Sequence, residues 1–269
     1  MQITKKKLIN IVLSLILSAN VMAQQKHTNN DYDTRLYLVG TMHQDFARFT
    51  TDDLVSIFRK IKPDVILVER DSSMLTKDNW YPKVISPELE QRAVTIYRKE
   101  SDFIILPYEY EGRNAYKRKN EFKKNDTLLF TEIKQLKSKR KLSDDSLRWL
   151  KEVDLATELV ASLLNESACV FNSDTALKVV KQRKNRMYNN ISLIIKDNAE
   201  LAEFESHWKR VIDFWHIRNK SMAENIIRHY KNYTGKKILV LNGFSHKYLL
   251  THHLTEEGIP LSKFCNGSM

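Results

Sequence analysis

Short apolar runs bounded by turn residues predict buried strands in two separate parts of the chain. They lie at 36–39, 65–68, 103–106 and 238–241. Runs of four such residues are too short for helices, and without polar alternation they are typical of strands buried on both faces. Helical spacing of apolar residues follows a Thr51-Asp52-Asp53 cap and again follows Pro87, which we place at the first position of its helix. This β-α-β-α-β order predicts an α/β fold with a mostly parallel central sheet flanked by helices.

From about residue 115 to about 230 the pattern is one of charged, amphipathic helices, with no convincing strand. One helix is expected from Asp144 to Leu164, and a final one near Asn219 to Tyr233 leads through Gly235 into the fourth strand. The fourth strand is thus separated from the first three by a large inserted all-helical lobe. We therefore expect residues 24–269 to form a single α/β domain carrying this insertion.

The first 23 residues have the pattern of a secretory signal peptide. A basic Lys5-Lys6-Lys7 segment precedes an apolar stretch from Leu8 to Ala19, and Val21-Met22-Ala23 supplies a small-residue cleavage site. The apolar stretch is too short to span a bilayer comfortably. We expect cleavage near Ala23, a mature chain without a transmembrane segment, and a periplasmic or secreted location.

Charge and cysteine content refine this picture. Removing the three lysines of the signal peptide lowers the formal net charge from +11 to +8, and residues 117–141 carry ten basic residues against three acidic ones. Export disfavours nucleic acid as the partner, which leaves a solvated helical face or contact with an anionic cell surface. Cys169 and Cys265 are the only cysteines, and the sequence leaves open whether they pair or stay as buried thiols.

Two Gly-x-x-His tetrads follow predicted strands. They are Gly40-Thr41-Met42-His43 and Gly243-Phe244-Ser245-His246, and they begin 203 residues apart. With 6 Gly and 8 His in 269 residues, random placement predicts on the order of 0.2 such tetrads. A glycine at a strand end lets the backbone turn sharply, so that the histidine projects from the carboxyl edge, where α/β sheets bind ligands.

Glu69 ends the second strand, and we predict that it converges with His43 and His246. Two imidazoles and a carboxylate suit a divalent metal such as manganese, cobalt or zinc, and a metal-bound water is hydrolytic. Without metal, Glu69 or a histidine can act as general base on water. The structural alternatives are hydrogen-bonded histidines and a Glu69 paired on the surface with Arg70 or with a helix lysine. Glu109, after the third strand, is a weaker candidate.

Arg218 is the candidate for charge stabilisation. We expect it where a helix begins, with Met222 and Ile226 on the buried side of that helix. A fixed guanidinium can hold a carboxylate or an oxyanion by two hydrogen bonds. The alternative is an ordinary buried arginine that pairs with Glu69.

The two tetrads, Glu69 and the segment from Arg218 to Ala223 resemble the TraB/GumN/Tiki family. That family includes pheromone-shutdown proteins and secreted Wnt-inactivating metalloproteases. The resemblance spans residues 36–262 through short motifs. It implies that His43 and His246 are metal ligands, that Glu69 is a ligand or base, and that Arg218 stabilises an anionic intermediate. Many members have a small residue soon after the second tetrad, where this chain has Lys247-Tyr248.

These residues support three functional hypotheses. The first is an exported, metal-dependent, peptidase-like hydrolase acting on a peptide or a small ester or amide. The second is a metal-free hydrolase of the erythromycin-esterase kind, and the third is a non-catalytic protein that sequesters a peptide. A serine hydrolase is disfavoured because Lys247 replaces the second glycine of the nucleophile elbow around Ser245.

Overall fold

The structure is a computed structural model that describes residues 33–76 and 87–265. The predicted signal peptide lies outside the described residues. From Thr34 onward the chain forms one compact unit. Of the helices in the described ranges, none is long and apolar enough to cross a membrane.

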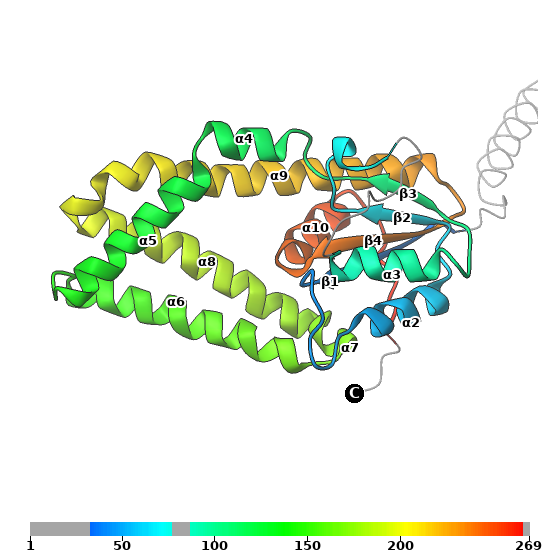
Figure 1. Cartoon of the computed structure of the whole chain (residues 1–269), viewed down its shortest axis with the longest axis horizontal. Coiled ribbons are helices and arrows are strands. Elements are labelled where there is room, and N and C mark those ends of the chain that lie inside the picture. The colour runs from blue at the N-terminus through cyan, green and yellow to red at the C-terminus, as the bar shows by residue number, and fades with distance from the viewer. Residues whose placement is uncertain (1–32, 77–86, 266–269) are drawn as a thin grey trace, which may run out of the picture. The chain divides into compact units, whose positions relative to one another are not determined.

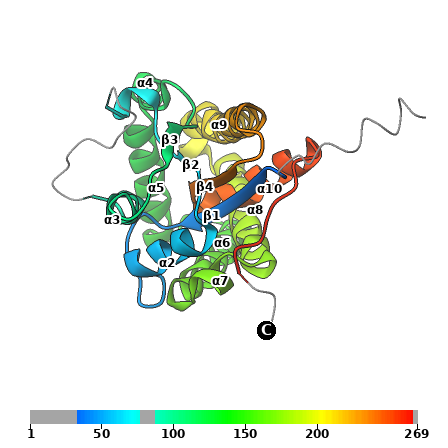
Figure 2. The ribbon, with the colours of Figure 1, turned by 90° about the vertical axis from the view of Figure 1, so that its right-hand side faces the viewer.

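Four parallel strands form one sheet in the order β1-β4-β2-β3 (Figures 1 and 2), which confirms the predicted α/β class. The strands are β1 (Arg35–Thr41), β2 (Val65–Val68), β3 (Ile104–Pro107) and β4 (Lys237–Gly243). The last strand is inserted between β1 and β2, so the two tetrads lie on neighbouring strands. Their register pairs Gly40 with Asn242 and Thr41 with Gly243.

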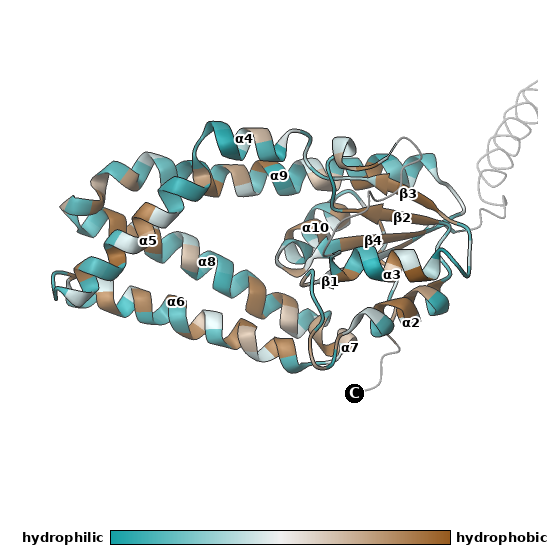
Figure 3. Ribbon diagram, in the orientation of Figure 1, coloured by the Kyte–Doolittle hydropathy of each residue, from teal (hydrophilic) through white to brown (hydrophobic). Residues whose placement is uncertain are grey.

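Both faces of the sheet are covered, as the unbroken apolar strands predict. Successive side chains of a strand point to opposite faces. On one face Val39 and Ile66 pack with helices α2 (Thr51–Ile61) and α3 (Leu89–Tyr97). On the other, Leu38 and Leu67 pack with α10 (Phe244–Glu256) and the C-terminal half of α9 (Glu205–Asn232). Figure 3 shows the strands as the most hydrophobic part of the unit.

The predicted insertion is helical throughout and has an apolar core of its own, which includes Ile191, Ile194 and Trp208. Its helices before α9 are α4 (Arg113–Lys119), α5 (Phe122–Ser138), α6 (Asp144–Ser162), α7 (Ala168–Phe171) and α8 (Asp174–Asp197). In the described ranges, short 3₁₀ segments lie within the lobe at Leu163–Asn165 and Ala199–Phe204, and outside it, after β2, at Ser72–Met74.

Two predicted helix starts were wrong. The last helix before β4 begins at Glu205 rather than near Asn219, because no Gly or Pro interrupts its 28 residues and its first half packs into the lobe core. Arg218 therefore lies in the interior of α9, not at a helix start. Helix α3 begins at Leu89 after an extended Glu88, so Pro87 precedes the helix instead of occupying its first position.

Cys169 and Cys265 form a disulfide, which settles the question that the sequence left open. Their Cα atoms are 5.7 Å apart and they are separated by 96 positions in the chain. The disulfide joins α7 to the C-terminal segment. In that segment Leu261 forms a parallel β-bridge with Leu36 of β1.

Reducing this disulfide is expected to lower the stability of the unit by about 2–5 kcal/mol, because it closes a long loop. That corresponds to a fall in Tm on the order of 10 °C for a chain of this size. Thermal melts with and without dithiothreitol measure it, and a Cys169→Ser/Cys265→Ser double variant should melt at the lower temperature without responding to the reductant. Equal melting temperatures for the oxidised and reduced protein would contradict the expectation.

Candidate active site

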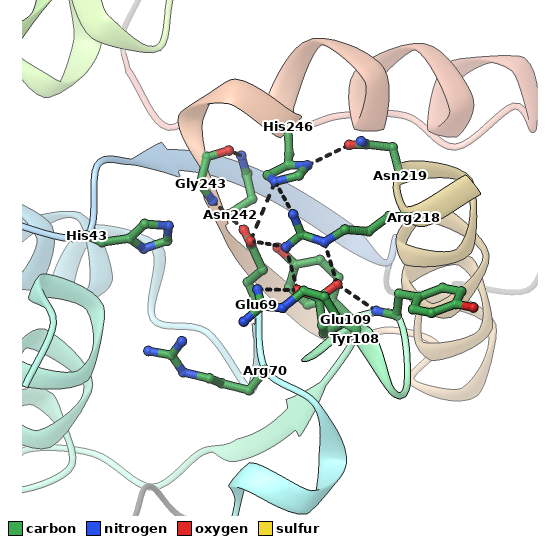
Figure 4. A network of polar contacts seen from close by, with 12 residues as sticks. His43, Glu69, Arg70, Tyr108, Glu109, Arg218, Asn219, Asn242, Gly243 and His246 are labelled. Atoms are coloured by element: carbon green, nitrogen blue, oxygen red, sulfur yellow. Dashed lines mark hydrogen bonds and ion pairs between the residues drawn. The ribbon is translucent and has the colours of Figure 1, made fainter. Parts of the chain in front are cut away.

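Three predicted site residues converge around Gly243, the last residue of β4. A Cβ atom at this glycine would lie 3.0 Å from His43 Nε2, 3.3 Å from Glu69 Oε2 and 3.5 Å from His246 Cδ2. They come from the ends of β1, β2 and β4, and Figure 4 shows Glu69 and His246 together around Arg218, with His43 apart from them. The absent side chain at Gly243 is therefore what lets the three groups approach one another.

The guanidinium of Arg218 is the centre of this cluster (Figure 4). Its Nε and Nη2 donate to the two oxygens of Glu109 at 2.8 and 2.5 Å, and Nη2 also donates to Glu69 Oε1 at 2.7 Å. Its Nη1 donates to His246 Nε2 at 2.9 Å. These contacts use four of the five N–H groups of an arginine. One N–H on Nη1 remains for another acceptor.

His246 is a neutral imidazole held in one tautomer. Its Nδ1 donates to Asn219 Oδ1 at 2.8 Å, so Nε2 keeps the lone pair that accepts from Arg218. Burial, with the Arg218 charge adding to it, holds the pKa of His246 well below its usual range. The ring of Trp215 stacks on the imidazole with the centroids 4.3 Å apart. Helix α9 thus fixes the protonation state and orientation of His246.

The two glutamates that bind Arg218 differ in their surroundings. Glu109 is 1% exposed and also accepts from Arg113 Nη1 at 2.9 Å, which makes it a buried structural anchor. Glu69 instead directs Oε2 toward Gly243, whose N–H donates to it at 2.6 Å. Glu69 pairs with Arg218, as in the structural alternative raised for Arg218. Arg70 pairs with Glu88.

His43 is the accessible member of the cluster, with 44% of its side chain exposed. Its Nδ1 donates to the buried carboxylate of Glu90 at 2.7 Å, and Glu88 lies 3.7 Å away. The hydrogen bond to Glu90, with further attraction from Glu90, Glu69 and Glu88, outweighs desolvation and raises the pKa of His43 from 6.5 to about 9. At neutral pH His43 is therefore an imidazolium whose Nε2–H lies near Gly243.

The backbone of His43 is in the left-handed region, with φ of 64°. This conformation costs a non-glycine residue about 1–3 kcal/mol and is concentrated at functional sites. The carbonyl of His43 accepts from the first N–H of α3, that of Leu89, at 3.1 Å. The hydrogen bonds from Leu89 and to Glu90 therefore both hold His43 against α3.

The predicted metal ligands are arranged around a guanidinium. His246 Nε2 already accepts from Arg218, and Glu69 already binds both Arg218 and Gly243. A divalent cation bound to His246 would lie against the Arg218 charge, so His43, His246 and Glu69 as placed do not fit a shared metal. In the described ranges, one group brings three possible ligand atoms within 4.8 Å of one another, and it is His43, Glu88 and Glu90.

The sequence analysis missed two residues that shape the site, Glu90 and Lys184. Glu90 lies among apolar neighbours on the inner side of α3 and is 6% exposed, so an acid within an apolar helical stripe was the available signal. Lys184 on α8 is 9% exposed, and its Nζ lies 3.8 Å from the centre of the Trp215 ring. No described carboxylate forms an ion pair with Lys184. Burial, with like charges nearby, lowers its pKa to about 7.

Comparisons with protein-family models, with curated proteins and with solved structures find no significant match to this chain. The resemblance to the TraB/GumN/Tiki family therefore stays an expectation carried by the two tetrads, Glu69 and the Arg218 segment.

Proposed function

We propose that this protein is a hydrolase that cleaves an ester or amide bond by acid–base catalysis at the carboxyl edge of β1, β2 and β4. The observation that carries the proposal is the approach of the His43 imidazolium to the Glu69 carboxylate across Gly243, next to a fixed guanidinium. An imidazolium and a carboxylate that face the same space can act as general acid and general base.

Each residue then has one role. Glu69 takes a proton from a water molecule as its oxygen attacks the carbonyl carbon, and His43 Nε2 gives its proton to the departing oxygen or nitrogen. The unused Nη1–H of Arg218 donates to the carbonyl oxygen as negative charge develops there. His246 does not exchange protons. It accepts from Arg218 and keeps the guanidinium oriented.

The metal-dependent, peptidase-like hydrolase, which is the first hypothesis from the sequence, is the second candidate. The observation that favours it is the grouping of His43, Glu88 and Glu90, which differs from the ligand set expected from the sequence. Binding there would require His43 to lose its Nδ1 proton and its hydrogen bond to Glu90.

The charge around the site favours a substrate that carries an anionic group. Lys184 is buried, and no described carboxylate forms an ion pair with it. Lys117 on α4 is exposed, and its pKa is lowered by partial desolvation, to which the charges of Arg218 and Arg113 add. Removing ammonium groups from water without an anion is unfavourable. A substrate carboxylate beside Trp215 would provide the missing countercharge.

Export belongs to this proposal and is supported by the signal-peptide pattern and by the disulfide, since disulfides persist in oxidising compartments. The basic segment 117–141 covers the end of α4, all of α5 and the turn after it. Contact of this segment with an anionic cell surface stays part of the proposal.

Glu69→Gln is expected to lower kcat by about 10²–10⁴-fold, because it removes the base while keeping the size of the side chain. Glu109→Gln is the matched control, since it also removes a carboxylate from Arg218 but not one that faces Gly243. A panel of chromogenic esters, anilides and fluorogenic peptides measures both variants, with circular dichroism to check folding. Equal losses of activity in the two variants would contradict the role given to Glu69.

Chelator is expected to leave the activity unchanged, and manganese, cobalt and zinc are expected not to raise the Tm of the wild type. The metal-dependent candidate gives the opposite result. There, chelator abolishes activity, and the metals stabilise the wild type but neither His43→Ala nor Glu88→Gln.

Activity that needs protonated His43 is expected to fall as the pH rises through about 9. Glu90→Gln should move this loss of activity toward pH 6.5, because the Glu90 hydrogen bond is the largest cause of the raised pKa of His43.

The His43–Glu90 pair also stabilises the folded state. Its contribution is fully present below pH 6.5 and is lost as the pH rises through about 9. The Tm difference between wild type and Glu90→Gln should therefore shrink across that interval. A histidine NMR titration measures the pKa directly, and a His43 signal titrating near 6.5 in the wild type would refute the assignment.

Lys184→Met is expected to raise KM about tenfold or more for substrates that carry a carboxylate, with little change for neutral ones. Lys181→Met, an exposed lysine on the same helix, is the control. An equal effect of Lys184→Met on charged and neutral substrates would show a structural role instead.

A further inference from the structure

A cavity lies among α10, the start of α8 and the C-terminal segment, and its lining is distinct from the proposed reaction site. Its volume is about 680 Å³, within the roughly 300–1,000 Å³ typical of small-molecule sites. The Cys169–Cys265 disulfide forms part of its wall. The cavity is not lined by any of the residues placed in the proposed reaction site, which are His43, Glu69, Arg218 and His246. This cavity therefore needs an explanation of its own.

The wall contains the buried amine of Lys247, whose pKa is lowered to about 7 by burial. This residue is 6% exposed, and its Nζ donates to Asn172 Oδ1 at 2.7 Å and to the Asn172 carbonyl at 3.2 Å. No described carboxylate forms an ion pair with it. An ammonium has three donors, so one remains. Burying such a group without an anion is unfavourable, and an anionic ligand would compensate for that cost.

The remaining lining comprises an apolar part, a charged rim and five hydroxyl residues, Ser167, Ser173, Thr251, Thr255 and Ser262. The apolar part consists of Leu38, Val170, Leu177, Leu261 and Phe264. The rim carries exposed Asp174 and exposed Lys263, so the cavity as a whole has two amines against one carboxylate. An apolar body and a single negative charge are the complementary features of a ligand.

We propose that this cavity binds a small amphiphilic carboxylate, with its aliphatic part among the apolar residues and its carboxylate on Lys247. The inference is independent of the proposed hydrolase activity, since it uses none of the residues assigned to that reaction. Asn172 connects this cavity to the proposed reaction site. Besides its contacts with Lys247, its Oδ1 accepts from Gly40 N at 2.7 Å and its Nδ2 donates to the Gly40 carbonyl at 3.1 Å. Gly40 is the first residue of the tetrad that holds His43.

Isothermal titration of the oxidised protein with decanoate tests the proposal, with decanol as the uncharged comparison and both below their aggregation limits. The expected result is one decanoate bound per chain, with decanol at least tenfold weaker. Lys247→Met should weaken decanoate at least tenfold, to the level of decanol, whereas Lys247→Arg retains most of the affinity. Lys263→Met, on the rim, should change the affinity by less than threefold.

Leu177→Trp gives a second variant that fills the cavity without changing charge and should abolish binding of both compounds. It keeps the proposal testable if Lys247→Met does not fold, which thermal melts would reveal. Absence of decanoate binding to the wild type would overturn the proposal. So would equal affinities for decanoate and decanol, or undiminished decanoate binding in folded Lys247→Met or Leu177→Trp.

Discussion

The ion pairs of Arg218 with Glu69 and Glu109 hold the site together. They join the middle of α9 to the ends of β2 and β3, and through His246 they reach the first turn of α10. Removing one member of a buried ion pair costs about 3–5 kcal/mol because its partner is left buried and charged. The helical lobe and the sheet edge are therefore coupled at this point by charge as well as by apolar packing.

The chain topology explains why the coupling lies here. Strand β4 arrives last in the chain but takes the place between β1 and β2, so a residue at its end lies among the ends of earlier strands. Gly243 occupies that position, and a Cβ there would lie only 3.0 Å from His43 Nε2. The preceding helix α9 packs its Met222, Ala223 and Ile226 on the sheet just after it contributes Arg218. One helix thus supports the sheet and supplies the central cation.

The sequence was sufficient for the strands and for the convergence of His43, Glu69 and His246, because both depend on local patterns and on the common direction of parallel strands. It was insufficient for the start of α9. This helix changes from packing in the lobe to packing on the sheet without a Gly or Pro that would mark the change in the sequence. It was also insufficient for Glu90 and Lys184, whose importance depends on which distant side chains they meet. The disulfide falls in the same class, because 96 positions of separation carry no information about the distance between the two cysteines.

The two tetrads show why a shared motif does not imply a shared role. Both place a histidine three residues after a strand-end glycine, yet their protonation states are opposite. His43 is half exposed and faces a buried carboxylate, so its proton is stabilised, whereas His246 is buried against a guanidinium, so its proton is expelled. The difference arises from the segment after each strand. β1 leads into residues 42–50 before α2, where His43 contacts Glu90 of α3, and β4 enters α10 directly, beside α9. Surroundings rather than spacing therefore make one histidine a hydrogen-bond donor to Glu90 and the other an acceptor that positions Arg218.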